Sequence, residues 1–340
     1  MNSKTLVLNT LEMCSHDRAP RELWTLPWAS ARYPDALAAL QRDFPADIRG
    51  VPGFEREKDT AEGDPYAVGI SRDAWGCEVL NAQEGVIGQV KHPQIVTEDW
   101  SDADAVRFPT EWLTIDREKI NACCRENSEY FLLMGACPRP FEQLQFLRGT
   151  AQLYMDLMDP PPEMLRFMAK MHAFYCEQLE LWAKTDVDAL RFMDDWGSQR
   201  ALLIPPRVWR QFFRPMYKDY IDIAHRAGKK IFMHSDGHTL AILPDLIEMG
   251  LDAVNAQLFC MGVENLAPLR GQITFWGEID RQHLLPHGTL QEIEQAVTLV
   301  HDTLWQHGGC IAQCEFGPGG RPENVRRVYE TWDKLTKAAK

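Results

Sequence analysis

The sequence has no apolar run approaching the roughly 20 residues that span a bilayer, which argues against a membrane-spanning protein. It also lacks a basic stripe or block: the formal net charge is −13 and the pI about 5.3. Because phosphate contacts need clustered Lys and Arg, this charge argues against nucleic acid as a partner. A membrane-surface helix is disfavoured for the same reason.

The cysteines show no spacing that is typical of a disulfide framework. The nine cysteines are an odd number without regular spacing, and Cys123 and Cys124 are adjacent. The start of the chain already contains Glu12 and Asp17 beside a short apolar patch, so it does not resemble a secretory signal. We therefore expect free thiols in a reducing compartment and a cytoplasmic protein.

The second half of the chain shows a regular alternation of short apolar strands and longer helices. Such alternation predicts parallel strands with helical crossovers. The six expected strands cover residues 130–135, 189–193, 230–234, 253–255, 273–276 and 310–314. The expected helices cover 111–124, 141–156, 160–185, 205–227, 240–248, 290–305 and 322 to the end.

The first 110 residues are less regular. We expect a strand within 23–28, a helix over 34–44 and two short strands at 73–79 and 84–90. Two strands from this region added to the six would close an α/β (β/α)8 TIM barrel. An open doubly wound sheet is the alternative, but the glycine-rich phosphate loop that such sheets carry is absent. No linker is visible, so residues 1–340 are expected to form one domain, with residues 1–110 decorating the barrel.

Polar residues follow five consecutive strands at the same end, where barrel enzymes place their active sites. Helix caps explain some of the acids, but they explain a histidine and a cysteine poorly. The sequence therefore predicts a converging site, made of Asp194, Asp195, Trp196, Gln199, His234, Asp236, Asn255, Gln257, Trp276, Glu278 and Cys314.

His234 and Asp236 leave one strand as residues i and i+2, so both side chains can face the same way. Imidazole and carboxylate both bind zinc, and a distant cysteine could complete the set. The alternative is a hydrogen-bonded core histidine beside a helix-capping acid. Asp194 and Asp195 are neighbours, so one is expected to face the pocket as a base or orienting group and the other to cap or pair.

The stretch from His234 to Asn324 resembles the uroporphyrinogen decarboxylase superfamily. The resemblance rests on His-Ser-Asp-Gly after a strand, on Leu-Pro-Asp-Leu-Ile-Glu-Met-Gly, on Trp-Gly-Glu-Ile-Asp and on Pro-Glu-Asn-Val after a glycine-rich turn. Upstream, Asp-Ala-Trp-Gly-Cys and Asp-Asp-Trp-Gly fit the same pattern. The resemblance implies a (β/α)8 barrel.

The resemblance is closer to the methyltransferase branch than to true decarboxylases. The segment 21–32 lacks the Arg-Gln-Ala-Gly-Arg motif of decarboxylases, and Cys314 stands where they tend to have a histidine. The zinc methyltransferases, which exchange methyl groups between a corrinoid protein and a thiol such as coenzyme M, carry His-x-Cys-Gly and a later Cys. Here His234 matches the histidine, Asp236 replaces the first cysteine and Cys314 matches the second.

The resemblance thus implies a zinc-assisted methyltransferase with His234, Asp236 and Cys314 as metal ligands and Glu278 as a fourth ligand or proton acceptor. Asp194 or Asp195 would orient the substrate. Trp196, Gln199, Asn255, Gln257 and Trp276 would contact it. The donor would be a corrinoid protein or a methylated small molecule. Alternatives are a cofactor-free decarboxylase of a small carboxylic acid and a non-catalytic barrel that binds a corrinoid or tetrapyrrole. Aromatics such as Trp182 suggest a homodimer.

Overall fold

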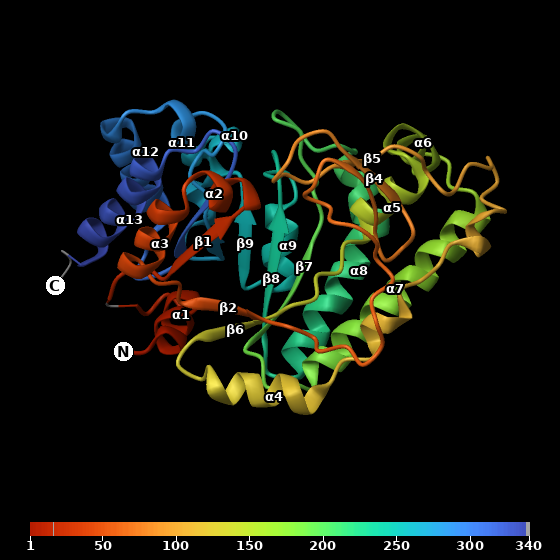
Figure 1. Ribbon diagram of the computed structural model, residues 1–340, viewed down its shortest axis with the longest axis horizontal. Helices are drawn as coiled ribbons and strands as arrows, with labels where there is room; N and C mark the ends of the chain where they lie inside the picture. The colour runs from red at the N-terminus through yellow and green to blue at the C-terminus, as the bar shows by residue number, and fades with distance from the viewer. Residues whose placement is uncertain (16, 338–340) are drawn as a thin grey trace.

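The protein forms a barrel of eight parallel strands, as a computed structural model that describes residues 1–15 and 17–337 shows (Figure 1). The strands lie in the order β1–β11–β10–β9–β8–β7–β6–β2. Their bounds are β1 (Arg21–Thr25), β2 (Ile48–Val51), β6 (Phe131–Met134), β7 (Ala189–Met193), β8 (Lys230–Ser235), β9 (Ala253–Ala256), β10 (Thr274–Trp276) and β11 (Cys310–Phe316). The predicted TIM barrel is confirmed.

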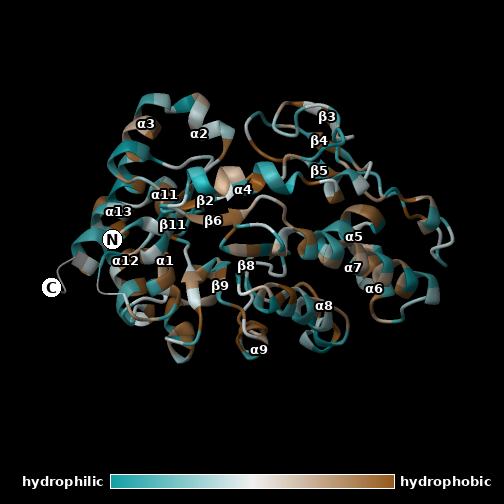
Figure 2. Cartoon of the chain, turned by 90° about the horizontal axis from the view of Figure 1, so that it is seen from below, coloured by the Kyte–Doolittle hydropathy of each residue, from teal (hydrophilic) through white to brown (hydrophobic). Residues whose placement is uncertain are grey.

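Helices surround the barrel and carry the chain from one strand to the next. Figure 2 shows that these helices carry both hydrophobic and hydrophilic residues, as helices between a core and solvent do. They are α2 (Pro27–Arg32), α3 (Pro34–Asp43), α4 (Arg117–Glu126), α5 (Pro140–Arg148), α6 (Thr150–Asp156), α7 (Pro162–Ala183), α8 (Pro206–Arg226), α9 (Leu243–Met249), α10 (Leu258–Met261), α11 (Leu284–His287), α12 (Leu290–Leu304) and α13 (Pro322–Lys337). Short 3₁₀ turns cover Ala103–Ala105, Thr110–Leu113 and Val263–Leu269.

Asp47 joins the two ends of the sheet, β1 and β2. Its backbone N–H donates to the carbonyl of Arg21 at 2.8 Å, and its carboxylate accepts from the backbone N–H of Arg21 at 2.8 Å. The same carboxylate accepts two bonds from the Arg18 guanidinium and one from the Ser3 hydroxyl. Asp47 is fully buried, and its backbone and side chain together join β1 to β2.

Strand alternation divides the core into two parts. The barrel interior holds a compact apolar cluster, and helix α1 (Ser3–Leu11) adds Val7 to it from below. The much larger second cluster lies between the strands and the outer helices. Because α1 fills the N-terminal end, open space inside the barrel lies at the C-terminal ends of the strands. The interior cluster comprises Val7, Ile48, Phe131, Leu133, Ala189, Phe232, Ala253, Trp276 and Ile311.

The N-terminal region supplies two barrel strands and a rim. The strand expected within 23–28 is β1, and the helix expected at 34–44 is α3. The second barrel strand, β2, was not predicted, because Arg49 and Gly50 expose this short segment and make it resemble a turn. An antiparallel sheet of β3 (Gly69–Arg72), β4 (Glu78–Asn81) and β5 (Gln89–Val90) decorates the barrel. The sequence predicted two strands here, at 73–79 and 84–90, and missed β3.

Two other expectations need correction. The helix predicted over 141–156 is broken into α5 and α6 at Gly149, whose φ of 82° is outside the helical region. Trp182 is completely buried in α7, so it gives no reason to expect a homodimer. Within the described residues, no helix is both long and apolar enough to cross a membrane.

Candidate active site

The register of three adjacent strands brings the central polar residues into one row. Met193 of β7 pairs with His234 of β8, and His234 pairs with Asn255 of β9. Side chains alternate between the two faces of a strand, and all three of these belong to the set that points into the barrel interior. The alternation continues past the strand ends, so Asp195 after β7 and Asp236 after β8, the strand of His234 itself, also point inward and approach His234.

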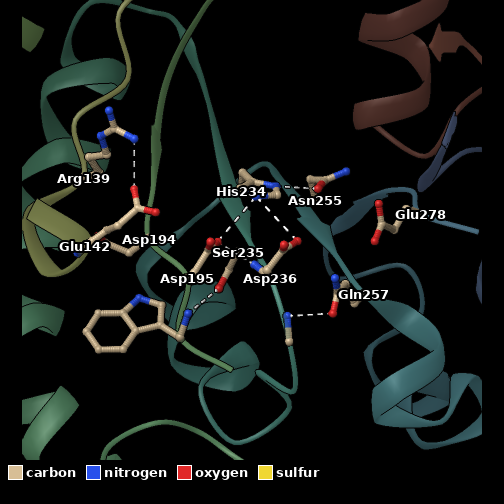
Figure 3. Close-up of polar contacts among 12 residues, drawn as sticks. Arg139, Glu142, Asp194, Asp195, His234, Ser235, Asp236, Asn255, Gln257 and Glu278 are labelled. Atoms are coloured by element: carbon tan, nitrogen blue, oxygen red, sulfur yellow. Dashed lines mark hydrogen bonds and ion pairs between the residues drawn. The ribbon is translucent and has the colours of Figure 1, made fainter. Parts of the chain in front are cut away.

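His234 is the centre of this group (Figure 3). Its Nδ1 lies 2.6 Å from Oδ1 of Asn255. The Asn255 amide nitrogen donates to the carbonyl of Trp276, which fixes Oδ1 toward the histidine. Nδ1 of His234 therefore carries a proton and donates it, so the neutral ring presents the lone pair of Nε2. Nε2 lies 3.5 Å from Asp195 Oδ1 and 3.7 Å from Asp236 Oδ1.

The geometry of Asp195, His234 and Asp236 fits a divalent metal. One ligand atom from each residue lies within 4.8 Å of the others. Ligand bonds of about 2.0–2.2 Å at the tetrahedral angle separate two donors by about 3.4 Å, close to the 3.5 and 3.7 Å found here. Metal-bound histidines usually donate their second ring N–H to an oxygen, as His234 does to Asn255.

Arg281 balances the acids around this group. Its guanidinium bonds to Asp236, lies 3.2 Å from Glu315 and 3.5 Å from Glu278. Burial raises the pKa of Glu278 to about 8, and burial also raises the pKa of Asp195 and Glu315. The acids outnumber the cations, and burial disfavours the charged forms of Asp195, Glu278 and Glu315. A bound cation would relieve this.

The group faces a cavity of about 650 Å³ between the strand ends and the β3–β5 rim. Trp24 and Met193 form apolar parts of its wall. Arg139 and Glu142, 3.1 Å apart, form a second charged pair on the side away from Asp236. The polar residues lining it include Asp73, Arg139, Glu142, Asp195, His234, Asp236, Arg281 and Glu315. A small organic molecule can therefore contact the His234 group while remaining enclosed.

Two glycines hold the Asp195 and Asp236 loops together. A Cβ on Gly197 would lie 2.1 Å from the backbone nitrogen of His238, and one on Gly237 would lie 2.0 Å from the carbonyl oxygen of Gly197. The Gly197 N–H donates to the carbonyl of Asp236 at 3.0 Å. The Asp236 N–H in turn donates to the Asp195 carboxylate at 2.9 Å. The spacing of the two acids thus depends on backbone contact.

A Gly197→Ala variant is expected to bind metal about 10–100-fold more weakly, the range for lost support of a metal ligand, because the added methyl group forces the two loops apart. Gly50→Ala in β2 is the control, since a Cβ there meets nothing within 4 Å. Metal affinity measured by chelator competition checks the prediction. Equal affinity in both variants would contradict this account of the loops.

Cys314 is not brought to His234 and Asp236. On β11, Ile311 and Glu315 face the interior, so the side chain of Cys314 points to the outer side of the barrel. Its Sγ lies 3.7 Å from the Tyr329 hydroxyl of α13, and burial raises the pKa of the thiol to about 12. The ligand set His234, Asp236 and Cys314 is therefore not assembled. Asp195 is the residue that lies beside His234 and Asp236, and Glu315 is the cavity-facing residue of β11.

Asp194 and Trp196 also face the outer layer. Asp194 is fully buried and accepts bonds from the Glu142 backbone N–H at 2.7 Å and the Tyr217 hydroxyl at 2.5 Å. It thereby caps α5, while burial raises its pKa well above the ordinary value. Trp196 stacks on Phe141 with ring centroids 3.9 Å apart. The two acids thus divide as adjacency on a strand predicts, with Asp195 facing the cavity.

The remaining predicted residues lie around the site. Asn255 orients His234, and Trp276 lines a 420 Å³ hollow that shares Trp24 and His234 with the main cavity. Gln199, Gln257 and Glu278 line a smaller hollow of about 140 Å³. Gln257 also accepts a bond from the Gly237 N–H at 3.1 Å. These three are therefore placed beside the main cavity.

The cavity-lining residues that were not predicted include Trp24, Arg139, Glu142, Arg281 and Glu315. The alternation of side chains along β11 could have identified Glu315, because it follows Ile311 and Gln313 at intervals of two residues. Arg139 and Arg281 lie in loops beyond their strands, where the side chains follow no regular alternation that a sequence pattern could reveal.

Glu22 is a buried acid below the cavity. Trp276 Nε1 donates to it at 2.5 Å, and burial raises its pKa to about 7 from the ordinary 4.5. The folded protein thus holds a proton that the unfolded chain releases above pH 4.5. Wild-type stability must therefore fall as pH rises from about 4.5 to about 7 and change no further through this group above that range.

A Glu22→Gln variant keeps the acceptor for Trp276 but cannot ionise. Relative to wild type, its unfolding free energy is expected to rise between pH 5 and 8 by up to about 3 kcal/mol. Denaturant unfolding at several pH values measures this difference. A difference that does not change with pH would show that Glu22 does not titrate in this range.

These features define a (β/α)8 barrel with an acid-rich cavity around one histidine at the C-terminal ends of its strands. The chain belongs to the uroporphyrinogen decarboxylase (URO-D) family, whose model matches residues 66–335. The family predicted from the His-Ser-Asp-Gly and Trp-Gly-Glu-Ile-Asp motifs is confirmed. Comparison with curated proteins finds no significant match.

The fold is similar to that of a methyltransferase from Methanosarcina mazei. The two share 13% identity, the match covers 98% of this chain and 99% of the other, and the TM-score is 0.69. An endo-β-1,4-xylanase from Gloeophyllum trabeum matches at 10% identity over 95% and 99% of the chains, with a TM-score of 0.42. A D-psicose 3-epimerase matches at 11% identity over 67% and 83%, with a TM-score of 0.39. At such identities the likeness to the methyltransferase concerns the fold alone, and the weaker two carry no argument.

Proposed function

We propose that the protein is a metal-assisted methyltransferase that moves a methyl group from a corrinoid protein or a methylated small molecule to a thiol-like acceptor. The observation that carries the proposal is the convergence of Asp195, His234 and Asp236 at metal-ligand spacing in an enclosed cavity. Membership of the URO-D family and the fold shared with a methyltransferase agree with it.

The three residues would hold zinc or another divalent metal, through Nε2 of His234 and one carboxylate oxygen from each acid. A donor set of one nitrogen and two oxygens is harder than one containing thiolate. A metal held there would lower the pKa of an acceptor thiol and so make a nucleophile available at neutral pH. Asn255 keeps the His234 ring oriented, and Arg281 holds Asp236 in place.

The cavity residues would accept the thiol proton and enclose the substrates. Glu315 faces the cavity, and its raised pKa makes it a suitable acceptor for the proton that leaves the thiol. The sulfur electron pair then forms the new carbon–sulfur bond, while the electrons of the broken bond remain with the methyl donor. Trp24 and Met193 supply apolar walls that exclude water from the transfer.

The test is anaerobic incubation of metal-loaded protein with methylcobalamin and a panel of small thiols. We expect loss of the methylcobalamin spectrum together with a methylated thiol detected by mass spectrometry, and neither in His234→Ala protein. Metal-free protein that transfers methyl groups at the full rate would refute the proposed role of the metal.

Decarboxylation is the second candidate, and Glu278 favours it. With a pKa of about 8, this buried acid is protonated at neutral pH and could deliver a proton to a developing carbanion. Arg281, which lies 3.5 Å from Glu278 and lines both the smaller hollow and the main cavity, could hold the substrate carboxylate. This reaction predicts CO2 release that is independent of metal and strongly reduced in Glu278→Gln.

A further inference from the structure

A second group of metal-ligand side chains lies outside the cavity, on helices α7 and α8. His172 and Cys176 are four residues apart on α7, so they share one face of the helix. Asp219 approaches them from α8. One ligand atom from each of the three lies within 4.8 Å of the others.

The distances match a tetrahedral zinc site. Bonds of about 2.3 Å to sulfur and 2.0–2.1 Å to nitrogen place the two donors about 3.6 Å apart at the tetrahedral angle. The Cys176 Sγ lies 3.6 Å from Nε2 of His172. The Asp219 carboxylate lies 2.9 Å from the same nitrogen, and its 59% exposure leaves it room to move outward by the few tenths of an ångström required.

The surroundings orient the histidine for this role. The Tyr220 hydroxyl lies 3.5 Å from Nδ1 of His172, and the two rings pack with centroids 5.5 Å apart. Tyr220 is fully buried, so it holds the imidazole with Nε2 toward Asp219, while the Cys176 Sγ lies 3.6 Å from Nε2 and 3.7 Å from Nδ1. This is the outer contact expected of a metal-bound histidine.

Charge and access also favour a cation. Arg226, which acts electrostatically on Cys176, is paired with Glu180 at 2.8 Å and forms no ion pair with Asp219. The His172 side chain is 22% exposed, which allows an ion to enter from solvent and leaves space for a water as fourth ligand.

We propose that His172, Cys176 and Asp219 form a second metal site, which binds zinc or another borderline divalent cation and links α7 to α8. Sulfur, nitrogen and oxygen donors together suit zinc. On binding, the thiol proton passes to solvent and the thiolate pairs with the metal. The site is independent of the proposed methyltransferase function, because none of its residues lines the cavity.

Cobalt(II) distinguishes the two sites. The group around His234 contains no sulfur, so a sulfur-to-cobalt charge-transfer band in the near ultraviolet must come from a cysteine site. We expect metal-depleted wild type and His234→Ala to develop this band on cobalt titration, and Cys176→Ser to lack it. Cys260→Ser, which removes another half-buried cysteine, is expected to keep it.

Thermal unfolding gives a second readout. Zinc at 100 times its dissociation constant adds about 2.7 kcal/mol of stability, so the midpoint in a His234→Ala background should rise with zinc, and the rise should disappear when Cys176→Ser is added. Activity of Cys176→Ser should equal that of wild type. A band that persists in Cys176→Ser, or a wild type without one, would overturn the proposal.

Discussion

His234→Ala protein is expected to lose its barrel metal and at least about 1000-fold in methyl-transfer rate. A metal contributes several kcal/mol of transition-state stabilisation, and about 4 kcal/mol corresponds to 1000-fold. His234 supplies the only nitrogen donor of the group and lies between both acids. The rate is measured with saturating donor and acceptor under anaerobic conditions.

Two further variants are compared with His234→Ala: one with a smaller expected effect and one with none. Asn255→Ala removes the partner of Nδ1 but no ligand, so metal affinity should fall by only about 10–100-fold. His225→Ala removes a histidine that pairs with Asp252 outside the cavity and should leave metal and rate unchanged. Wild-type metal content and rate in His234→Ala would contradict the assignment.

Asp47→Ala is expected to lower the free energy of unfolding by about 3–5 kcal/mol, the cost of breaking a buried ion pair. The Asp47 carboxylate accepts four hydrogen bonds, from Ser3, from two nitrogens of Arg18 and from the Arg21 backbone. Its loss leaves the Arg18 charge without this partner and opens the junction of β1 and β2. Denaturant unfolding at neutral pH gives the difference.

The matched control is Asp222→Ala. Asp222 forms an exposed pair with Lys218 on α8, and such helix pairs contribute about 0.3–0.5 kcal/mol. If Asp47→Ala cost no more than this control, the barrel ends would be joined by other contacts, and the role given to Asp47 would fail.

The sequence predicted the barrel well because its regular half repeats one pattern. Apolar segments such as 189–193 and 230–235 are short, and each is followed by an amphipathic helix, so the element order follows from periodicity alone. β2 escaped notice because a strand of four residues containing Arg49 and Gly50 has no apolar alternation. Its place is fixed by pairing with β6, which is a property of the assembled sheet.

The site was predicted in outline, and its details depended on which way side chains point. His234 and Asp236 share a face, as their spacing indicated. Cys314 was chosen for its distance along the sequence from Asp236. Because side chains alternate along β11, Cys314 points toward Tyr329 and Glu315 points into the cavity. Arg281 could not be predicted, because it reaches Asp236 from a loop after β10.

We propose that Asp195, and not Cys314, completes the metal site with His234 and Asp236. The most direct measurement is elemental analysis of Cys176→Ser protein, in which the α7–α8 site is removed, alone and combined with Asp195→Ala or Cys314→Ala. We expect about one metal per chain in Cys176→Ser and in the Cys314→Ala combination, and loss of the metal in the Asp195→Ala combination. Loss with Cys314→Ala and retention with Asp195→Ala would contradict it.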